Sequence, residues 1–256
     1  MKQIPNIFTL LNLVFGCIAI VFALQTDAIN IFQGDDLTTS FNMPEKLTFA
    51  AICIGIAAII DFLDGFIARL FNASSELGKQ LDSLSDVVSF GVAPAVILYQ
   101  FLRLSFMQEE NAFDVNTVWL MPAFIFAAAG AFRLARFNID PSQAYGFKGV
   151  PIPAAGLVIA SLPLIAHYNY FDGAVNVLLF NKWFLYVLIL MTSYLMISKL
   201  PLMALKFKNP GILNNLPKVF LVIVAILAAI LLKWLAVPVV FISYIALSLM
   251  FKNKAT

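Results

Sequence analysis

The sequence predicts an all-α, polytopic integral membrane protein, and three observations support this fold class. Hydrophobic residues make up 62% of the 256 residues and charged residues only 12%, about half of the ~25% typical of soluble domains. Mean hydropathy is +0.93. The apolar residues gather in runs long enough to cross a bilayer, which takes about 20 residues per helix. This composition excludes a water-soluble enzyme, a disordered chain and a nucleic-acid-binding protein.

Eight apolar runs predict about eight transmembrane helices in a single membrane-embedded domain that occupies residues 1–256. No connection between them is long enough for a soluble domain. Only a short turn before Pro238 separates the last two runs, so these two are the hardest to count. The runs cover roughly 7–25, 46–72, 81–106, 117–138, 151–169, 183–199, 217–235 and 237–251.

The positive charges predict the orientation, because cytoplasmic loops of membrane proteins are rich in Lys and Arg. One side of the predicted bundle carries 12 of the 16 basic residues: Lys2, Arg69, Lys79, Arg133, Arg136, Lys148, Lys199, Lys206, Lys208, Lys218, Lys252 and Lys254. Both termini are therefore expected to face the cytoplasm. The compact chain with no targeting segment favours a bacterial cytoplasmic membrane.

Four aspartates stand inside the apolar runs, where an ionisable residue is costly and is by default a functional candidate. Asp61 and Asp64 are three residues apart at the end of the second run, so they share a helix face. Asp82 and Asp86 are four apart at the start of the third run and share a face in the same way. The two runs are antiparallel and joined by a short connection, so the two faces can meet.

Carboxylates gathered in this way repel each other unless positive charge lies among them. Ligands that are all oxygen suit a hard divalent cation such as Mg²⁺, Mn²⁺ or Ca²⁺. Two such ions would balance four carboxylates, and a two-ion site is suited to phosphoryl displacement. The pattern therefore predicts a divalent-metal site, with two ions of Mg²⁺ or Mn²⁺ as the expected occupants.

Small and basic residues are interleaved with the aspartates. Gly65 and Ala68 leave the helix surface bare beside the carboxylates, and Arg69 can pair with a phosphate through its planar guanidinium. Gly78 lies one turn before Asp82. The segment reads Asp61-x-x-Asp64-Gly65-x-x-Ala68-Arg69, then eight residues, then Gly78-x-x-x-Asp82-x-x-x-Asp86.

In every one of these positions, and in both spacings, the segment resembles the signature of the CDP-alcohol phosphatidyltransferase family. The resemblance implies a six-helix catalytic core, usually a homodimer, with its active site at the cytoplasmic face of the membrane. Enzymes of this family displace CMP from a CDP-linked lipid by an alcohol. The resemblance also implies that the metal ions are held by Asp61, Asp64, Asp82 and Asp86, that the general base is Asp86, and that the CDP site is lined by Gly65, Ala68, Arg69 and Gly78.

Further polar residues are candidates for the CDP-lipid site. Ser75, next to Ser74 in the connection between the two helices, can donate a hydrogen bond to the cytidine or a phosphate, although ordinary loop serines have the same appearance. Asn6 and Thr9 are candidates for contact with the nucleotide, and capping of the first helix is the alternative.

Segments outside the motif indicate the acceptor alcohol. Residues 81–95, 133–138 and 147–155 resemble the phosphatidylserine synthase branch of the family. The glycerol-phosphate branch usually has Pro and Lys where this chain has Ser83 and Val87. The resemblance therefore implies transfer of the phosphatidyl group from CDP-diacylglycerol to the hydroxyl of L-serine, giving phosphatidylserine and CMP. The expected partners are these two substrates and the membrane lipids.

The serine carboxylate needs a cation, and the cytoplasmic ends of the fourth and fifth helices offer three. These are Arg133, Arg136 and Lys148, which are equally typical of positive-inside anchors. Asn138 is a candidate for orienting the amino group of serine.

Two alternatives stay open at this point. The same chemistry with inositol phosphate or glycerol phosphate as acceptor would also use basic residues near the site. A divalent-cation transporter would explain the aspartates, but it leaves the interleaved small and basic residues of the motif unexplained. The chain also lacks the inverted repeat often found in transporters.

Overall fold

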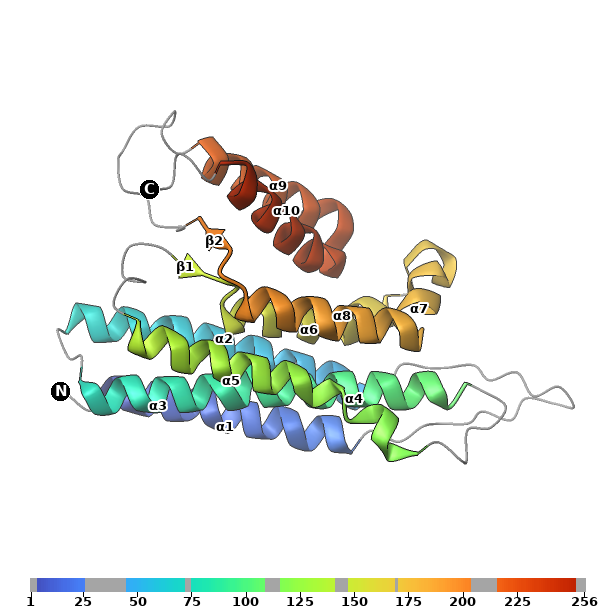
Figure 1. Cartoon of the computed structure of the whole chain (residues 1–256), viewed down its shortest axis with the longest axis horizontal. Coiled ribbons are helices and arrows are strands. Elements are labelled where there is room, and N and C mark those ends of the chain that lie inside the picture. Colours follow the sequence, from blue (N-terminus) through green and yellow to red (C-terminus); the bar gives the residue numbers. More distant parts are fainter. Residues whose placement is uncertain are drawn as a thin grey trace, which may run out of the picture.

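The structure is a computed structural model that describes residues 4–25, 45–71, 75–108, 116–140, 147–168, 170–203 and 216–251. Each of the eight predicted runs forms a helix, so the predicted all-α membrane fold is confirmed (Figure 1). The helices are α1 Ile4–Leu24, α2 Glu45–Leu70, α3 Glu76–Asp86, α4 Ala93–Phe106, α5 Ala123–Ile139, α6 Ile152–His167, α7 Ala174–Leu179, α8 Lys182–Ile197, α9 Leu216–Leu232 and α10 Ala236–Met250.

Short elements complete the described part of the chain. The two-residue strands β1 (Phe147–Lys148) and β2 (Pro201–Leu202) pair antiparallel, an element that the sequence did not predict. A π-helical segment connects α3 to α4, and 3₁₀ turns precede α5, α7 and α10. These are η1 Val87–Val92, η3 Thr117–Leu120, η5 Tyr170–Gly173 and η7 Lys233–Leu235.

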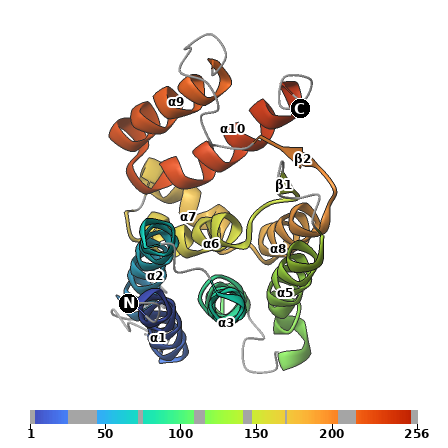
Figure 2. The ribbon, with the colours of Figure 1, turned by 90° about the vertical axis from the view of Figure 1, so that its left-hand side faces the viewer.

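Four stretches of the described residues are long and apolar enough to cross a membrane: Pro5–Leu24, Glu45–Leu70, Glu76–Phe106 and Leu216–Met250. The last of these contains both α9 and α10, which fold back on each other at η7 (Figure 2). Of the two shorter apolar helices, α6 lies beside the second and third stretches and α8 beside the third (Figure 2).

The stretch Glu76–Phe106 is the central helix of the bundle, because 72% of its most apolar part is buried, against 17% to 33% in the other three long stretches. Helices α1, α2, α5, α6 and α8 all pack against it (Figure 2). Phe90, Ile97 and Phe101 on this helix are fully buried and form the middle of the core. The arrangement gives six helices around one core, with the α9–α10 hairpin packed on one side.

The π-helical turn η1 begins immediately after Asp86 and ends two residues before Pro94. Pro94 has no N–H, and its ring clashes with the carbonyl four residues earlier, that of Phe90, in a regular α-helix. The chain widens instead, and the N–H of Ala93 bonds to the carbonyl of Val88, five residues back. Single π turns inside α-helices often mark functional sites.

Two glycines let neighbouring helices approach this turn closely. A Cβ on Gly16 of α1 would lie 2.8 Å from the Cα of Ser89, and a Cβ on Gly156 of α6 would lie 2.7 Å from the carbonyl oxygen of Phe90. Both distances are too short for a real methyl group to occupy. Helices α1 and α6 are therefore in backbone contact with the turn that follows Asp86.

We expect Gly156→Ala to lower the thermal stability of the purified protein, because the new methyl group has no room against the Phe90 carbonyl. Overpacking of this kind costs about 1–3 kcal/mol. The measurement is the melting temperature in detergent. Gly55→Ala is the matched control: its Cβ would meet nothing within 4 Å, and Ala is favoured over Gly in a helix interior by about 0.5–1 kcal/mol. Equal melting temperatures for the two variants would contradict this packing.

Candidate active site and metal centre

Three of the four motif aspartates form one compact cluster at the end of α2 and the start of α3. One carboxylate oxygen each from Asp61, Asp64 and Asp82 lies within 4.8 Å of the other two. The side chain of Asp64 is 6% exposed, and Asp61 and Asp82 are half-buried. The helical spacing thus brings these side chains together, as it predicted.

Asp86 extends this cluster into the bundle by one helical turn. Its side chain interacts with that of Asp61, and it is 7% exposed. The Oδ1 atom of Asp86 is buried and has no hydrogen-bond partner within the described residues. A buried hydrogen-bond acceptor without a donor destabilises the folded state. This oxygen therefore needs to bind a ligand atom, a metal ion or a proton.

The cluster fits a hard divalent cation. Its donors are all carboxylate oxygens, the ligand type that Mg²⁺ and Mn²⁺ prefer. Within the described residues no Lys or Arg lies at ion-pair distance from the four aspartates, and the ion pair found there joins Lys79 to Glu76 instead. The electrostatic interaction of Arg133 with Asp86 offsets only part of the negative charge of the cluster, and a bound metal would relieve the rest.

Helix α1 fixes the cluster through hydrogen bonds to both acidic helices. The hydroxyl of Thr9 donates to Oδ2 of Asp64 at 2.8 Å. The hydroxyl of Ser85, beside Asp86, donates to the carbonyl oxygen of Thr9 at 3.0 Å. Asn6 and Thr9 lie inside α1 and are buried, so they do not cap the start of this helix.

A cavity of about 150 Å³ opens beside the aspartates, between α1, α2 and the N-terminus of α3. It is lined by Pro5, Asn6, Thr9, Asp64, Gly65, Ala68, Ser75, Gly78, Lys79 and Asp82. Most of the residues predicted for the CDP-lipid site therefore face one space. The two additions, Pro5 and Lys79, were missed by the sequence analysis, although the position of Lys79 directly after Gly78 was a usable signal.

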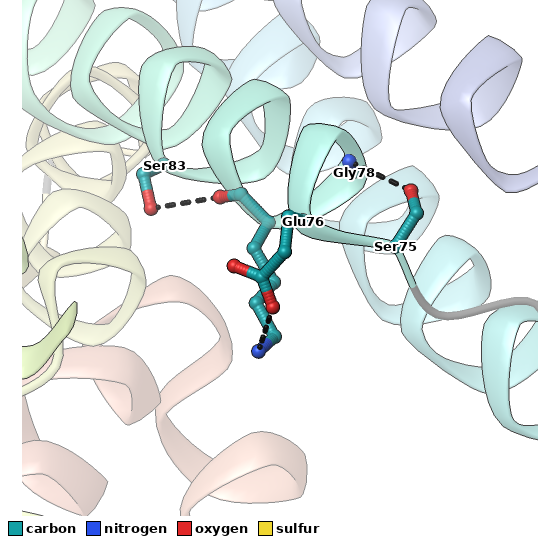
Figure 3. Close-up of polar contacts among 5 residues, drawn as sticks. Ser75, Glu76, Gly78 and Ser83 are labelled. Atoms are coloured by element: carbon teal, nitrogen blue, oxygen red, sulfur yellow. Dashed lines mark hydrogen bonds and ion pairs between the residues drawn. The ribbon is translucent and has the colours of Figure 1, made fainter. Parts of the chain in front are cut away.

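The N-terminus of α3 forms one wall of this cavity. The hydroxyl of Ser75 accepts the N–H of Gly78 at 3.0 Å and so caps the helix, while Lys79 pairs with Glu76 at 3.1 Å (Figure 3). A Cβ on Gly78 would lie 3.1 Å from both Asn6 Oδ1 and Ser75 Oγ, so a side chain there would crowd the cavity wall. Unpaired N–H groups and the dipole make a helix N-terminus attractive to phosphate.

Arg69 and Ser74 are the two predicted donor-site residues that the cavity does not include. Arg69 is exposed at the end of α2 and is absent from the cavity lining. Ser74 lies outside the described residues.

Among the predicted acceptor residues, the structure brings Arg133 to the aspartates. Its side chain is 5% exposed, and its guanidinium interacts electrostatically with Asp86. The guanidinium carbon lies 5.0 Å from the centre of the Phe137 ring, in a cation–π arrangement. The Nε atom of Arg133 is buried without a hydrogen-bond partner within the described residues.

The other predicted acceptor residues have different surroundings. Arg136 donates to the carbonyl oxygen of Ser198, after the end of α8, at 3.1 Å. Asn138 donates to the hydroxyl of Ser83 on α3 at 2.8 Å. Lys148 lies in β1, and its side chain is outside the described part of the structure.

Comparison with known protein families agrees with this geometry. The sequence model of the CDP-alcohol phosphatidyltransferase family matches residues 2–194, which include all four aspartates and the whole cavity lining. The chain belongs to this family. The matched segment ends inside α8, before the α9–α10 hairpin.

Relatives named CDP-diacylglycerol–serine O-phosphatidyltransferase are similar to large parts of the chain. The Helicobacter pylori (strain J99) protein is 33% identical over 172 residues, or 66% of this chain and 61% of the relative. The Mycobacterium leprae protein is 30% identical over 254 residues, or 96% of this chain and 73% of the relative. The Methanocaldococcus jannaschii protein is 38% identical over 156 residues, or 61% and 58%. The chain thus spans less than two thirds of the length of the Helicobacter relative.

We expect Asp64→Asn to weaken binding of Mn²⁺ at least about tenfold, equivalent to about 1.4 kcal/mol, because the variant keeps the side-chain size but removes one charged ligand. The measurement is a titration of Mn²⁺ followed by electron paramagnetic resonance. Glu76→Gln is the control, since Glu76 is an exposed acid at the start of the adjoining helix α3 and pairs with Lys79 outside the cluster. Equal affinities for the two variants would argue against a metal site at these aspartates.

Proposed function

We propose that this protein transfers the phosphatidyl group of CDP-diacylglycerol to the hydroxyl of L-serine, which yields phosphatidylserine and CMP. The observation that carries the proposal is the cluster of Asp61, Asp64 and Asp82, extended by Asp86, beside a cavity that the family motif lines. The names of the relatives support serine as the acceptor. A single membrane domain over residues 1–256, acting as a homodimer, is part of the proposal.

The cavity is the proposed site for the CDP part of the donor. A Cβ added at Gly65 would meet no other atom within 4 Å, so the helix surface at this residue is open to a ligand. Ser75 and the start of α3 provide polar groups for the phosphates, and Lys79 brings a positive charge to the same wall. We retain Arg69 as a phosphate partner, because it stands four residues after Gly65 and therefore on the same face of α2.

Divalent ions bound at Asp61, Asp64, Asp82 and Asp86 would neutralise the diphosphate and polarise the phosphorus that is attacked. Asp86 is the proposed general base, because its buried Oδ1 has no donor within the described residues and can accept the proton of the serine hydroxyl. As the serine oxygen bonds to phosphorus, the bond from phosphorus to the CMP oxygen breaks. CMP is a weak base, so its departure needs no strong acid.

Arg133 is the proposed partner of the serine carboxylate. Only two carbon atoms link the carboxylate group of serine to its hydroxyl oxygen, so the cation that binds the carboxylate must stand close to the base. Arg133 interacts electrostatically with Asp86 and has an unpartnered Nε. We assign Arg136, Asn138 and Lys148 to the rim of this acceptor site.

We further propose that the active site and both termini face the cytoplasm of a bacterial cell. Helix α1 begins and α10 ends at the same end of the molecule, which is also the end where α2 terminates and α3 begins (Figure 1). Most basic residues of the chain belong to the loops predicted for that side, in agreement with the positive-inside rule.

The activity assay uses purified full-length protein in detergent with CDP-diacylglycerol and Mn²⁺ or Mg²⁺. We expect CMP to be released only when L-serine is added. Release driven by inositol phosphate or glycerol phosphate, but not by serine, would refute the acceptor. No release with any acceptor, together with metal uptake into proteoliposomes, would favour a divalent-cation transporter.

Asp86→Asn should abolish turnover, by about 10²–10⁴-fold as expected for loss of a general base, and should retain most of the affinity for the CDP-lipid. Turnover is followed as CMP release and binding by equilibrium dialysis with the labelled lipid. Glu76→Gln, an exposed carboxylate on the same helix, is expected to keep normal turnover. Near-normal turnover in the Asp86 variant would remove this residue from the mechanism.

A further inference from the structure

Helix α1 carries a buried polar side chain, that of Asn12, which the proposed mechanism does not use. Thr9, Asn12 and Gly16 follow one another at spacings of three and four residues, so they share one face of α1. All three residues are buried, and Asn12 is 0% exposed. Because polar side chains inside a membrane-spanning helix are energetically unfavourable, Asn12 is a candidate for function.

The side-chain amide of Asn12 is unpaired in the part of the chain that the structure describes. Neither its Oδ1 nor its Nδ2 atom has a hydrogen-bond partner there. Gln100, on the central helix, shows the contrast, because its amide donates to the carbonyl oxygen of Ala23 on α1 at 2.8 Å. A buried amide without such a partner destabilises the folded protein. The Asn12 amide therefore indicates a ligand that pairs with it.

Two hydrogen bonds between α1 and the central helix fix the position of Asn12 along the bundle. The hydroxyl of Ser85 donates to the carbonyl oxygen of Thr9 at 3.0 Å. The hydroxyl of Ser89 donates to the carbonyl oxygen of Asn12, also at 3.0 Å. Asp86 stands between these two serines in the chain. The turn of α1 that carries Asn12 therefore lies at the level of the turn that carries Asp86.

Helix α2 brings Asp61 to the same level. Helices α1 and α2 pack against each other and run in opposite directions (Figure 1), and Thr9 of α1 donates to Asp64 of α2 at 2.8 Å. The next turn of α1, with Asn12, therefore meets the preceding turn of α2, with Asp61. Side chains on a helix tilt toward its N-terminus, and the N-terminus of α1 lies at the end of the molecule where α2 ends and α3 begins (Figure 1). Asn12 thus leans toward Asp61 and Asp86, which interact with each other.

We propose that the amide oxygen of Asn12 is a further ligand of the divalent cation, at the end of the cluster formed by Asp61 and Asp86. The inference rests on the metal site of the proposed function. Carbonyl oxygens suit Mg²⁺ and Mn²⁺ as ligands, and a neutral ligand adds no further repulsion among the carboxylates. The Nδ2 group of Asn12 remains available to donate to Oδ1 of Asp86, which likewise has no partner within the described residues.

This role differs from that of Thr9 on the same face of α1. Thr9 holds a metal ligand through a hydrogen bond that is already formed within the protein, whereas Asn12 binds the ion itself. Loss of the Asn12 oxygen should therefore weaken metal binding and leave the bond between Thr9 and Asp64 in place. An oxygen atom of another side chain at this position should restore metal binding.

The test is Asn12→Leu in the full-length protein, because leucine has a similar branched shape and no polar atom. We expect the affinity for Mn²⁺ to fall at least about tenfold, a loss of the size seen when even an outer partner of a metal ligand is removed. Electron paramagnetic resonance measures the bound Mn²⁺ at a concentration that just saturates the unmodified protein. As a second readout, the rise in melting temperature that Mn²⁺ produces should be smaller in the variant, because stabilisation by a ligand follows its affinity.

Two further variants make the result specific to the oxygen of Asn12. Asn12→Asp keeps an oxygen atom at this place and should bind Mn²⁺ at least as tightly as the unmodified protein. Ser193→Ala is the matched control, since the Ser193 hydroxyl is also buried without a partner among the described residues, on a helix that carries none of the aspartates. This control should leave Mn²⁺ binding unchanged.

Unchanged Mn²⁺ affinity in Asn12→Leu would overturn the inference, and so would an equal loss of affinity in Asn12→Leu and Asn12→Asp. A complete lack of Mn²⁺ binding by the unmodified protein would refute the metal site and this inference together. Binding of Mn²⁺ that depends on Asn12, with no release of CMP when serine is added, would support the inference and refute the proposed function.

Discussion

Mutual repulsion among the motif carboxylates is the constraint on which the rest of the structure depends. Two unit charges about 4 Å apart repel by about 4 kcal/mol at the effective dielectric of a protein surface, and here the acids come from two separate helices. The fold opposes this repulsion by tying α1 to both: Thr9 bonds to Asp64, and Ser85 bonds back to α1. With the helices held in this way, the repulsion would favour binding of a cation at the cluster, because a cation would remove this electrostatic cost.

The π turn after Asp86 separates two parts of the central helix that have different surroundings. Before the turn, α3 must present Asp82 and Asp86 to α2 and the cavity. After the turn, α4 is buried on nearly every side. One extra residue in the turn rotates the rest of the helix by about 100° relative to a regular α-helix. Pro94 lies at the start of α4 just after this turn, and Gly16 and Gly156 allow the neighbouring helices to pack against the turn. The orientation of the acids is thereby set independently of the core packing.

Periodicity explains which parts of this arrangement the sequence could predict. Spacings of three and four residues place side chains on one helix face whatever the tertiary fold, so the pairing of Asp61 with Asp64, and of Asp82 with Asp86, followed from local geometry, while the approach of the two pairs followed from the short connection between antiparallel helices. The positions of Arg136 and Asn138 did not. Their partners, Ser198 and Ser83, stand 62 and 55 residues away in the chain, and no local pattern encodes such contacts. The π turn and the β1–β2 pair depend in the same way on packing between distant segments.

The contrast between local helical spacing and tertiary contact also applies to the donor and acceptor sides of the proposed site. The cavity proposed for the donor is lined mostly by the compact motif on α2 and α3, with Pro5, Asn6 and Thr9 added from α1. Acceptor recognition must place a cation beside the base, and Arg133 reaches Asp86 only because α5 packs against the central helix. In the proposed function, the acceptor side therefore depends on tertiary packing more than the donor side does, because Arg133 comes from α5 and Asp86 from the central helix.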